Sequence, residues 1–175
     1  LVNPYHASCG KIDFHARAGE ECLASNVSVL LERIRAKYLE YGVKETPYVV
    51  VKADAGTYGM GVMMVRDAPE VKELNRKQRN KMAVVKEGLE VEQVILQEGV
   101  HTPERTREKP AEPVVYMIDR HVVGGFYRVH AARGADENLN APGMEFAPFG
   151  ARFPVYGVIA RLALAAAALE LERTA

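Results

Sequence analysis

The sequence lacks several features that mark specialised classes of protein. It has no tryptophan and only two cysteines in 175 residues, and its 23 lysines and arginines balance 23 aspartates and glutamates. Two cysteines are too few for a disulfide framework. Cys9 and Cys22 also lack the CxxC or histidine spacing of a metal site, so we expect reduced thiols. A neutral chain has no basic footprint for nucleic acid, so no nucleic-acid partner is expected.

A secretion signal and an uninterrupted membrane span are also missing from the sequence. The most apolar tract, residues 155–171, contains Arg161 and many alanines, and we expect it to form a packed helix and no membrane span. A hydrophobic content of 48% is enough to bury a core. These features indicate a soluble, cytoplasmic protein of one domain, or of one domain with a lobe. Because the chain begins inside a loop without methionine, we expect an N-terminal portion to be missing.

Residues 20–41 have the pattern of an amphipathic helix. Apolar side chains recur at helical spacing along one stripe, and charged residues occupy the other positions. Gly42 follows at the position where helices commonly end. The stripe consists of Leu23, Val27, Leu30, Leu31, Ile34 and Tyr38.

Residues 49–65, VVVKADAGTYGMGVMMV, carry the clearest functional signal. The valines at 49–51 predict a strand buried on both faces, with Lys52 at its end. A GxxGxG loop and a second apolar run follow, which predicts a β-hairpin. Glycines allow backbone N–H groups to converge on phosphate oxygens, and a lysine adds a point charge. The alternative interpretation is a glycine-rich hairpin with one exposed lysine.

The rest of the chain predicts further elements in order. A helix is expected over residues 68–82, including the basic segment LNRKQRNKM, whose cations either face solvent or contact phosphates. A strand is expected at 94–100, a loop at 101–113, and two strands in 114–130 joined near Asp119.

Two arginines and a polar loop are candidates for binding anions and cations. Arg120 lies at the predicted turn, and Arg128 lies among apolar residues, where a guanidinium needs a carboxylate or a bound anion as partner. The segment DENLNAPG, residues 136–143, concentrates the carboxylate and amide oxygens that Mg²⁺ accepts. The same residue types also favour simple turns.

Taken together, these motifs resemble the ATP-grasp-like glutamate–cysteine ligase family of proteobacteria over nearly the whole chain. The matching motifs are KIDF, GEECLASNV, VKADAGTYGMGVM, LNRKQRNKM, VVKEGLEV, QEGV, EPVVYMIDR, GGFYRVH, DENLNAPGMEF and YGVIARLALAAAALELE. The resemblance implies an α+β fold of two lobes, with nucleotide held between antiparallel sheets. It divides the chain into a loop and helix, residues 1–45, and an ATP-grasp-like catalytic region, residues 46–175. The segment at 147–152 looks shortened relative to the family.

The resemblance also implies roles for particular residues. The residues expected to bind nucleotide are Lys52, Gly56, Thr57, Gly59, Gly61, Lys86, Gln97, Glu98 and Val100. The residues expected to bind Mg²⁺ are Asp119, Glu137, Asn138 and Asn140, the nearest match to the acidic residue and Glu-x-Asn of ATP-grasp enzymes. Either Arg120 or Arg128 would stabilise the oxyanion or hold a substrate carboxylate, beside Lys52 as a catalytic residue.

The implied activity is the first step of glutathione synthesis, in which ATP drives the joining of the γ-carboxyl of L-glutamate to the amine of L-cysteine through a glutamyl phosphate. The expected partners are these small molecules, with a homo-oligomer possible. No enzyme nucleophile is required, so Cys9 and Cys22 are expected to be structural. Two alternatives stay open: another ATP-grasp carboxylate–amine ligase, and a non-enzymatic α/β binding module.

Overall fold

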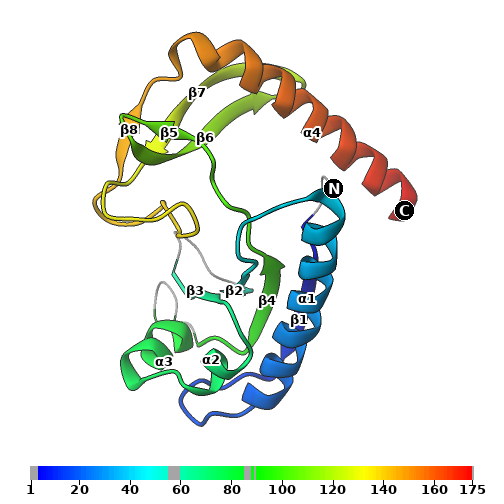
Figure 1. Ribbon diagram of the computed structural model, residues 1–175, viewed down its shortest axis with the longest axis vertical. Coiled ribbons are helices and arrows are strands. Elements are labelled where there is room, and N and C mark those ends of the chain that lie inside the picture. Colours follow the sequence, from blue (N-terminus) through cyan, green and yellow to red (C-terminus); the bar gives the residue numbers. More distant parts are fainter. Residues whose placement is uncertain (1–3, 55–59, 85–87, 89, 175) are drawn as a thin grey trace. The chain divides into compact units, whose positions relative to one another are not determined.

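The computed structural model describes residues 4–54, 60–84, 88 and 90–174, which divide between two units (Figure 1). We call residues 4–101 the first unit and residues 102–174 the second unit. Each contains its own four-stranded antiparallel sheet together with helices. The α+β class predicted from the sequence is therefore confirmed.

The first unit is built on a sheet with the strand order β1-β4-β2-β3, in which every neighbouring pair is antiparallel. Its β1 belongs to the segment expected at 1–45, and it pairs with β4 at the edge of the sheet. The elements in chain order are β1 (His6–Gly10), α1 (Glu20–Tyr41), β2 (Val49–Ala53), β3 (Val62–Val65), α2 (Pro69–Lys72), α3 (Arg76–Ala83) and β4 (Gln93–Glu98).

Helix α1 has the bounds that the sequence predicted, Glu20–Tyr41. Gly42 ends it with a positive φ of 67°, which a residue without Cβ adopts at little cost. Its apolar stripe packs against β2 and β4, and α1 lies along one face of the sheet in Figure 1. The shared core includes Leu23, Val27, Leu30, Leu31 and Ile34 of α1 with Val49, Val51 and Leu96 of the strands.

Among the described residues, the core covers only one face of β2, so the expectation of burial on both faces is wrong there. Val49 and Val51 are fully buried, whereas Val50 between them is half-buried. Alternate residues of a strand point to opposite faces, and only the face toward α1 is covered by the core. Lys52 is the fourth residue of this five-residue strand, and it lies on the other face.

The predicted hairpin is confirmed, because β2 and β3 pair with Lys52 opposite Val62. The single helix predicted over 68–82 is wrong, since two short helices, α2 and α3, occupy this segment. Asn75 starts the second one: its side chain accepts from the Gln78 amide, and the Gln78 side chain accepts from the Asn75 amide. This capping box fixes a new helix start at Asn75.

The second unit has the sheet order β5-β6-β7-β8. The hairpin predicted in 114–130 is confirmed, and Asp119 takes a positive φ of 51° at its turn. The loop predicted at 101–113 is wrong, because β5 and the start of β6 lie there. The elements are β5 (Arg105–Thr106), β6 (Lys109–Ile118), β7 (His121–Val129), β8 (Glu145–Ala147), the 3-10 turn η2 (Gly150–Arg152) and α4 (Phe153–Thr174).

A small aromatic core joins η2 and α4 to this sheet. Its buried members are Ala111, Tyr127, Val129, Phe149 and Tyr156. The Tyr127 and Phe149 rings meet edge to face with centroids 4.8 Å apart. The hydroxyls of Tyr127 and Tyr156 form a hydrogen bond of 2.6 Å. Gly125 leaves the space that the Phe149 ring fills, because a Cβ there would lie 2.3 Å from the ring.

The helix predicted at 155–171 forms as α4. The expectation that it is a packed helix is wrong, because within the described residues 102–174 most of its apolar side chains are not buried. Tyr156 is buried, whereas Val155, Val158 and Leu162 are more than half exposed. Figure 1 shows the C-terminal half of α4 continuing past the sheet of its own unit. The segment Gly150–Arg173 is long and apolar enough to cross a membrane by length and composition alone, which for a single helix is weak evidence.

Candidate functional site

The first candidate site lies on the sheet face of the first unit that α1 does not cover. Strand alternation places Lys52 and Gln97 there, since their neighbours Val51 and Leu96 point into the core. The register sets Val50 opposite Gln97, so Lys52 and Gln97 are diagonal neighbours. The Lys52 Nζ donates a hydrogen bond of 2.6 Å to the Gln97 Oε1, and both side chains are half-buried.

The partner of Lys52 is neutral, which leaves the lysine's charge available. Among the residues that the structure describes, no carboxylate forms an ion pair with Lys52. An ammonium group has three donors, and Gln97 takes one of them. This face therefore presents a fixed cation with free donors, a suitable arrangement for an anion such as a phosphate.

Glu98 lies on the opposite, helix-covered face of the same sheet. Its carboxylate is buried, forms an ion pair with Lys37 and accepts a 2.9 Å hydrogen bond from the Tyr5 amide. The Lys37 ammonium also lies 4.5 Å from the centre of the Tyr5 ring. The structure thus gives Glu98 a role in tying α1 and the Tyr5 segment to β4. Its predicted contact with the nucleotide stays a prediction.

The other predicted nucleotide residues of the first unit lie near the strand ends. Gly61 has a φ of 60°, and its carbonyl accepts from the Ala53 amide at 2.8 Å. The side chain of Val100 is exposed, and its carbonyl accepts from the Tyr48 hydroxyl at 2.9 Å. Four further predicted residues lie outside the described residues: Gly56, Thr57, Gly59 and Lys86.

A second candidate site lies on the uncovered face of the sheet in the second unit. The Arg128 Nη1 donates a 3.0 Å hydrogen bond to the Glu112 Oε2, so of the two partners that the sequence left open, a protein carboxylate and a bound anion, the structure shows a carboxylate. The Arg128 Nε is buried and has no hydrogen-bond partner in the described part of the chain. Sequence analysis missed Glu112 as the partner. A β-bulge between Tyr116 and Met117 shifts the pairing of β6 with β7 by one residue, and this shift places Glu112 opposite Arg128.

Aromatic side chains share this face with Arg128. Phe126 lies two residues before it on β7, and Phe146 of β8 lies directly opposite it. The Phe126 ring is 5.0 Å from the Phe146 ring and 5.8 Å from the Tyr116 ring, centre to centre. Phe146 and Tyr116 are more than half exposed. An arginine with an unpaired N–H beside exposed planar rings can bind a small molecule that carries a carboxylate.

The four predicted metal ligands divide between the two ends of β7. Asp119 lies in the exposed turn before this strand, together with Arg120, and the other three lie in the loop after it. Nine strand residues span roughly 26 Å, so β7 separates Asp119 from the later loop. The loop is itself anchored at the end of β7, where the His130 Nε2 meets the Pro142 carbonyl at 3.0 Å.

In that loop, Glu137 and Asn138 already make local hydrogen bonds. The Glu137 carboxylate accepts from the Gly134 amide at 2.7 Å and from Arg133 at 3.1 Å, and the hydrogen bond from Gly134 is the main cause that lowers the pKa of Glu137. The Asn138 Oδ1 accepts from the Asn140 amide at 2.9 Å, which is an Asx turn. An ionised carboxylate and amide oxygens thus occur together in one turn.

No group of three or more His, Cys, Asp or Glu side chains that could hold a metal ion occurs within residues 4–54, 60–84, 88 and 90–174. Mg²⁺ does not need such a cluster, because it keeps several waters and binds proteins through one or two carboxylates together with substrate phosphates. Glu137 with the oxygens of Asn138 and Asn140 therefore fits a magnesium ion that phosphate and water mainly hold.

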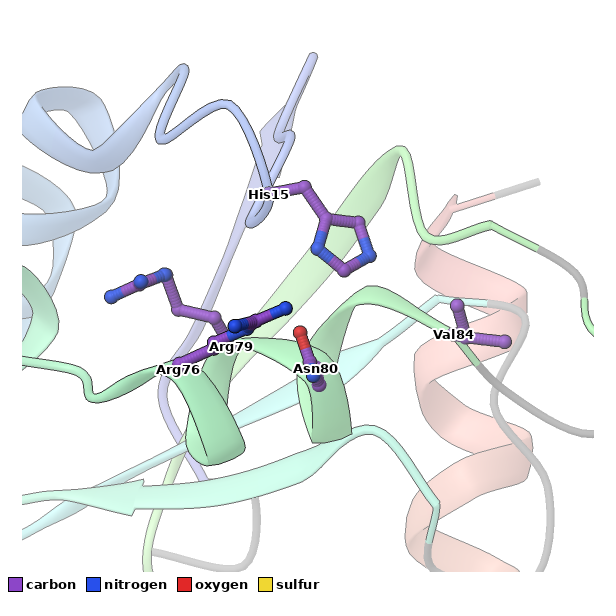
Figure 2. Close-up of a pocket in the computed structure, with 5 residues that line it drawn as sticks. All are labelled: His15, Arg76, Arg79, Asn80 and Val84. Carbon is purple, nitrogen blue, oxygen red and sulfur yellow. The ribbon is translucent and has the colours of Figure 1, made fainter.

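A basic hollow of about 460 Å³ lies elsewhere in the first unit. Figure 2 shows that α3 supplies Arg76, Arg79 and Asn80 to one side, whereas His15 reaches in from the loop before α1. Arg79 is held at its rim by a hydrogen bond to the Leu74 carbonyl. Three residues of the basic segment LNRKQRNKM therefore line this hollow, and most of the other residues of that segment are exposed.

Comparison with known proteins gives two matches. The family model of glutamate–cysteine ligase (GshA) matches residues 1–171. A crystal structure from Methylobacillus flagellatus KT, named "Putative gamma-glutamylcysteine synthetase", is 59% identical, with a TM-score of 0.79 over 99% of this chain and 45% of that chain. This chain therefore spans less than half the length of that protein. No curated protein matches. The resemblance drawn from the sequence motifs is confirmed.

Proposed function

This chain belongs to the glutamate–cysteine ligase family, and on that premise we propose that it takes part in joining the γ-carboxyl of L-glutamate to the amine of L-cysteine at the expense of ATP. Its partners would be these small molecules, and the reaction would take place in the cytoplasm. The observation that carries the proposal is Lys52 on the open face of the β1-β4-β2-β3 sheet, where no described carboxylate forms an ion pair with it.

Lys52 would bind the phosphate oxygens of ATP. Its position on a central strand fixes the stem of the side chain, so little entropy is lost when the ammonium binds an anion. The half-buried setting strengthens its attraction for phosphate relative to an exposed lysine. A cation held in this way stabilises the charge that develops on the phosphoryl oxygens during transfer.

Gln97 would act as a positioning residue. Its Oε1 accepts one of the three N–H donors of Lys52, which directs the other two away from the strand pair. Because an amide is neutral, this contact orients the ammonium without neutralising it. A carboxylate at the same place would reduce its attraction for phosphate.

Arg128 would bind the carboxylate of an amino-acid substrate or the oxyanion formed at its carbonyl. Glu112 engages the Nη1, and the buried Nε keeps a donor without a partner among the described residues. The Arg128 side chain is 21% exposed, so a ligand carboxylate would accept from the part of the guanidinium that solvent reaches. The neighbouring aromatic rings would exclude water from that contact.

Magnesium would be held by Glu137, with Asn138 or Asn140 as neutral partners. When bound, it would neutralise charge on the nucleotide phosphates. The Gly134 amide and Arg133 keep the Glu137 carboxylate ionised and fix its direction, and the Asx turn places the amide oxygens in the same loop.

A ligase assay with omitted substrates tests the proposal. The full-length protein is supplied with Mg·ATP, glutamate and cysteine, and release of inorganic phosphate and formation of the dipeptide are followed together. We expect both to require both amino acids at saturating ATP. A different amine that replaced cysteine with a higher kcat/KM would favour another carboxylate–amine ligase. No binding of Mg·ATP would favour a non-enzymatic module.

A further inference from the structure

The two cysteines of the chain lie in contact in the first unit. The Cys9 Sγ donates a hydrogen bond to the Cys22 Sγ across 3.2 Å, although thirteen positions separate them in the sequence. Cys9 belongs to β1, and Cys22 lies in the first turn of α1. Both are free thiols. The sequence offered no reason to expect this pairing, because no CxxC spacing connects them.

We propose that Cys9 and Cys22 form a reversible intramolecular disulfide by exchange with a small-molecule disulfide. A disulfide has sulfur atoms about 2.05 Å apart, so the two sulfurs need to approach by roughly 1.2 Å from their present separation. Side-chain rotation at the exposed Cys22 can supply a movement of this size. Disulfides in reducing compartments are usually transient and redox-sensing, which is the class that this pair fits.

Because the two cysteines are buried to different degrees, they have different roles in the exchange. Cys22 is exposed, so an external reagent can reach its sulfur, whereas Cys9 is 3% exposed and cannot be reached from solvent. Burial, followed by the hydrogen bond with Cys22, raises the pKa of the Cys9 thiol to about 11. Cys22 therefore reacts first with the small disulfide, and Cys9 then attacks the Cys22 sulfur. The raised pKa leaves little of Cys9 as thiolate, but its contact with the Cys22 sulfur compensates for this.

The exchange balances in two steps. The Cys22 thiol loses its proton and attacks one sulfur of the small disulfide, RSSR, which forms a Cys22–SR mixed disulfide and releases one RSH. The Cys9 thiol then loses its proton and attacks the Cys22 sulfur, which forms the Cys9–Cys22 bond and releases a second RSH. The protein gives up two electrons and two protons, and RSSR takes them up as two thiols.

The bond would tie an edge strand to the helix that covers it. Strand β1 pairs only with β4 among the described strands, and a covalent link to α1 would add a second anchor. The same strand places His6 opposite Gln97, next to the Lys52 face. Because the bond closes a loop in the unfolded chain, we expect the oxidised protein to unfold at a higher temperature than the reduced one.

The test uses the full chain and 2-hydroxyethyl disulfide as the probe. After acid quenching and alkylation, intact-mass and peptide analysis identify each cysteine's state. We expect the wild type to lose two hydrogens, to give a peptide pair joined through Cys9 and Cys22, and to revert with dithiothreitol. Cys9→Ser should instead accumulate a mixed disulfide at Cys22, and Cys22→Ser should react at neither position.

Three results would overturn the proposal: wild type that accumulates the same mixed disulfide as Cys9→Ser, a protein disulfide found only between two chains, or a Cys22→Ser variant that reacts at Cys9. Circular dichroism of each variant confirms folding. Since Cys22 is exposed, its replacement by serine leaves the core intact and keeps the test decisive if Cys9→Ser does not fold. As a second readout, oxidation should raise the unfolding midpoint of wild type and leave that of Cys22→Ser unchanged.

Discussion

The two units of this chain bury their apolar residues to very different degrees. Among the described residues, the core cluster of the first unit has 20 buried members drawn from its strands, helices and connecting loops, whereas that of the second unit has five. The second unit in turn exposes large apolar side chains on its sheet and along α4, among them Tyr116, Ile118, Phe146 and Leu162. The first unit thus has an extensive apolar core, and the core of the second consists mainly of a few aromatic contacts.

The comparison also separates structural from functional faces. In the first unit one sheet face is committed to the core with α1, and the other carries Lys52 and Gln97. In the second unit the covered face holds Tyr127, which contacts Tyr156 of α4, and the open face holds Arg128 with exposed aromatic rings. In both units the candidate basic residue of the sheet, Lys52 or Arg128, lies on the face that packing does not use, whereas Glu98 lies on the covered face.

Truncating the larger core should have the largest effect on stability. Leu30 is 2% exposed in the centre of α1, and Leu30→Ala should lower the free energy of unfolding by about 2–5 kcal/mol, because it removes buried methyl groups and leaves a cavity. Val29→Ala is the control, since Val29 is 55% exposed and should cost less than about 0.5 kcal/mol. Urea unfolding measures both. Equal losses would mean that the α1 stripe is not the core.

Filling the space at Gly125 should break the smaller core. A Cβ there would lie 2.3 Å from the Phe149 ring and 2.7 Å from the Val114 carbonyl, so Gly125→Ala should cost about 1–3 kcal/mol through overpacking. Gly124→Ala, one residue earlier, meets nothing within 4 Å and serves as the control. Amide hydrogen exchange should show faster opening in the second unit for Gly125→Ala alone. Equal protection in both variants would contradict this packing.

The hydrogen bond between Tyr127 and Tyr156 in the core of the second unit should be sensitive to alkali. Tyr156→Phe removes the 2.6 Å contact with Tyr127 and should cost about 1 kcal/mol. Burial, followed by the hydrogen bond with Tyr127, raises the pKa of Tyr156 above its usual range. The folded state then keeps a proton that the unfolded state loses, so this stabilisation is complete below about pH 10 and declines as the pH rises further.

The measurement is unfolding of the second unit between pH 8 and pH 11, followed by near-ultraviolet circular dichroism. Wild type should lose stability above about pH 10, and Tyr156→Phe should lose less over the same range. Parallel pH dependence in the two proteins would show that Tyr156 does not titrate differently on unfolding.

Glu137→Gln should affect function and also lower stability slightly, because the Gly134 amide and Arg133 hold the ionised carboxylate. It removes the charge from the proposed magnesium ligand while keeping its shape, so more Mg²⁺ should be needed for half-maximal ligase rate at saturating ATP. Asp136→Asn, at the neighbouring position, controls for general loss of charge in this loop. If DENLNAPG is only a turn, as its internal hydrogen bonds also allow, the Mg²⁺ midpoint will not change.

Sequence analysis predicted the elements whose patterns are local. The α1 stripe and the hairpins of β2–β3 and β6–β7 follow from periodicity and turn residues, and all three are confirmed. The start of β6 was missed because Pro110 and Pro113 suggested a loop. The Ala111 amide donates a hydrogen bond to the Glu104 carbonyl on the β5 side of β6. Backbone groups two residues apart in a strand point the same way, so the nitrogen of Pro113 points toward the same side, beyond the end of β5. No strand pairs with that side of β6 at this position among the described residues, and a proline without an N–H is tolerated there.

Other features depend on contacts that a local pattern does not encode. The Lys52–Gln97 contact follows from the register of β2 against β4, and the Arg128–Glu112 pair follows from a bulge. The split between α2 and α3 could have been predicted, since Asn75 and Gln78 have capping-box spacing. The exposure of α4 could not, because its composition suits a buried helix equally well.

We infer that the open sheet face of the first unit binds nucleotide phosphate through Lys52. The most direct measurement is kcat/KM for ATP in the full-length protein for Lys52→Ala and for Lys77→Ala, an exposed lysine of α3. We expect Lys52→Ala to lower it on the order of 10²-fold or more, since a cation lost from a phosphate site weakens the transition state by several kcal/mol, and Lys77→Ala to leave it unchanged. A loss of less than about threefold for Lys52→Ala, with the fold intact by circular dichroism, would contradict the claim.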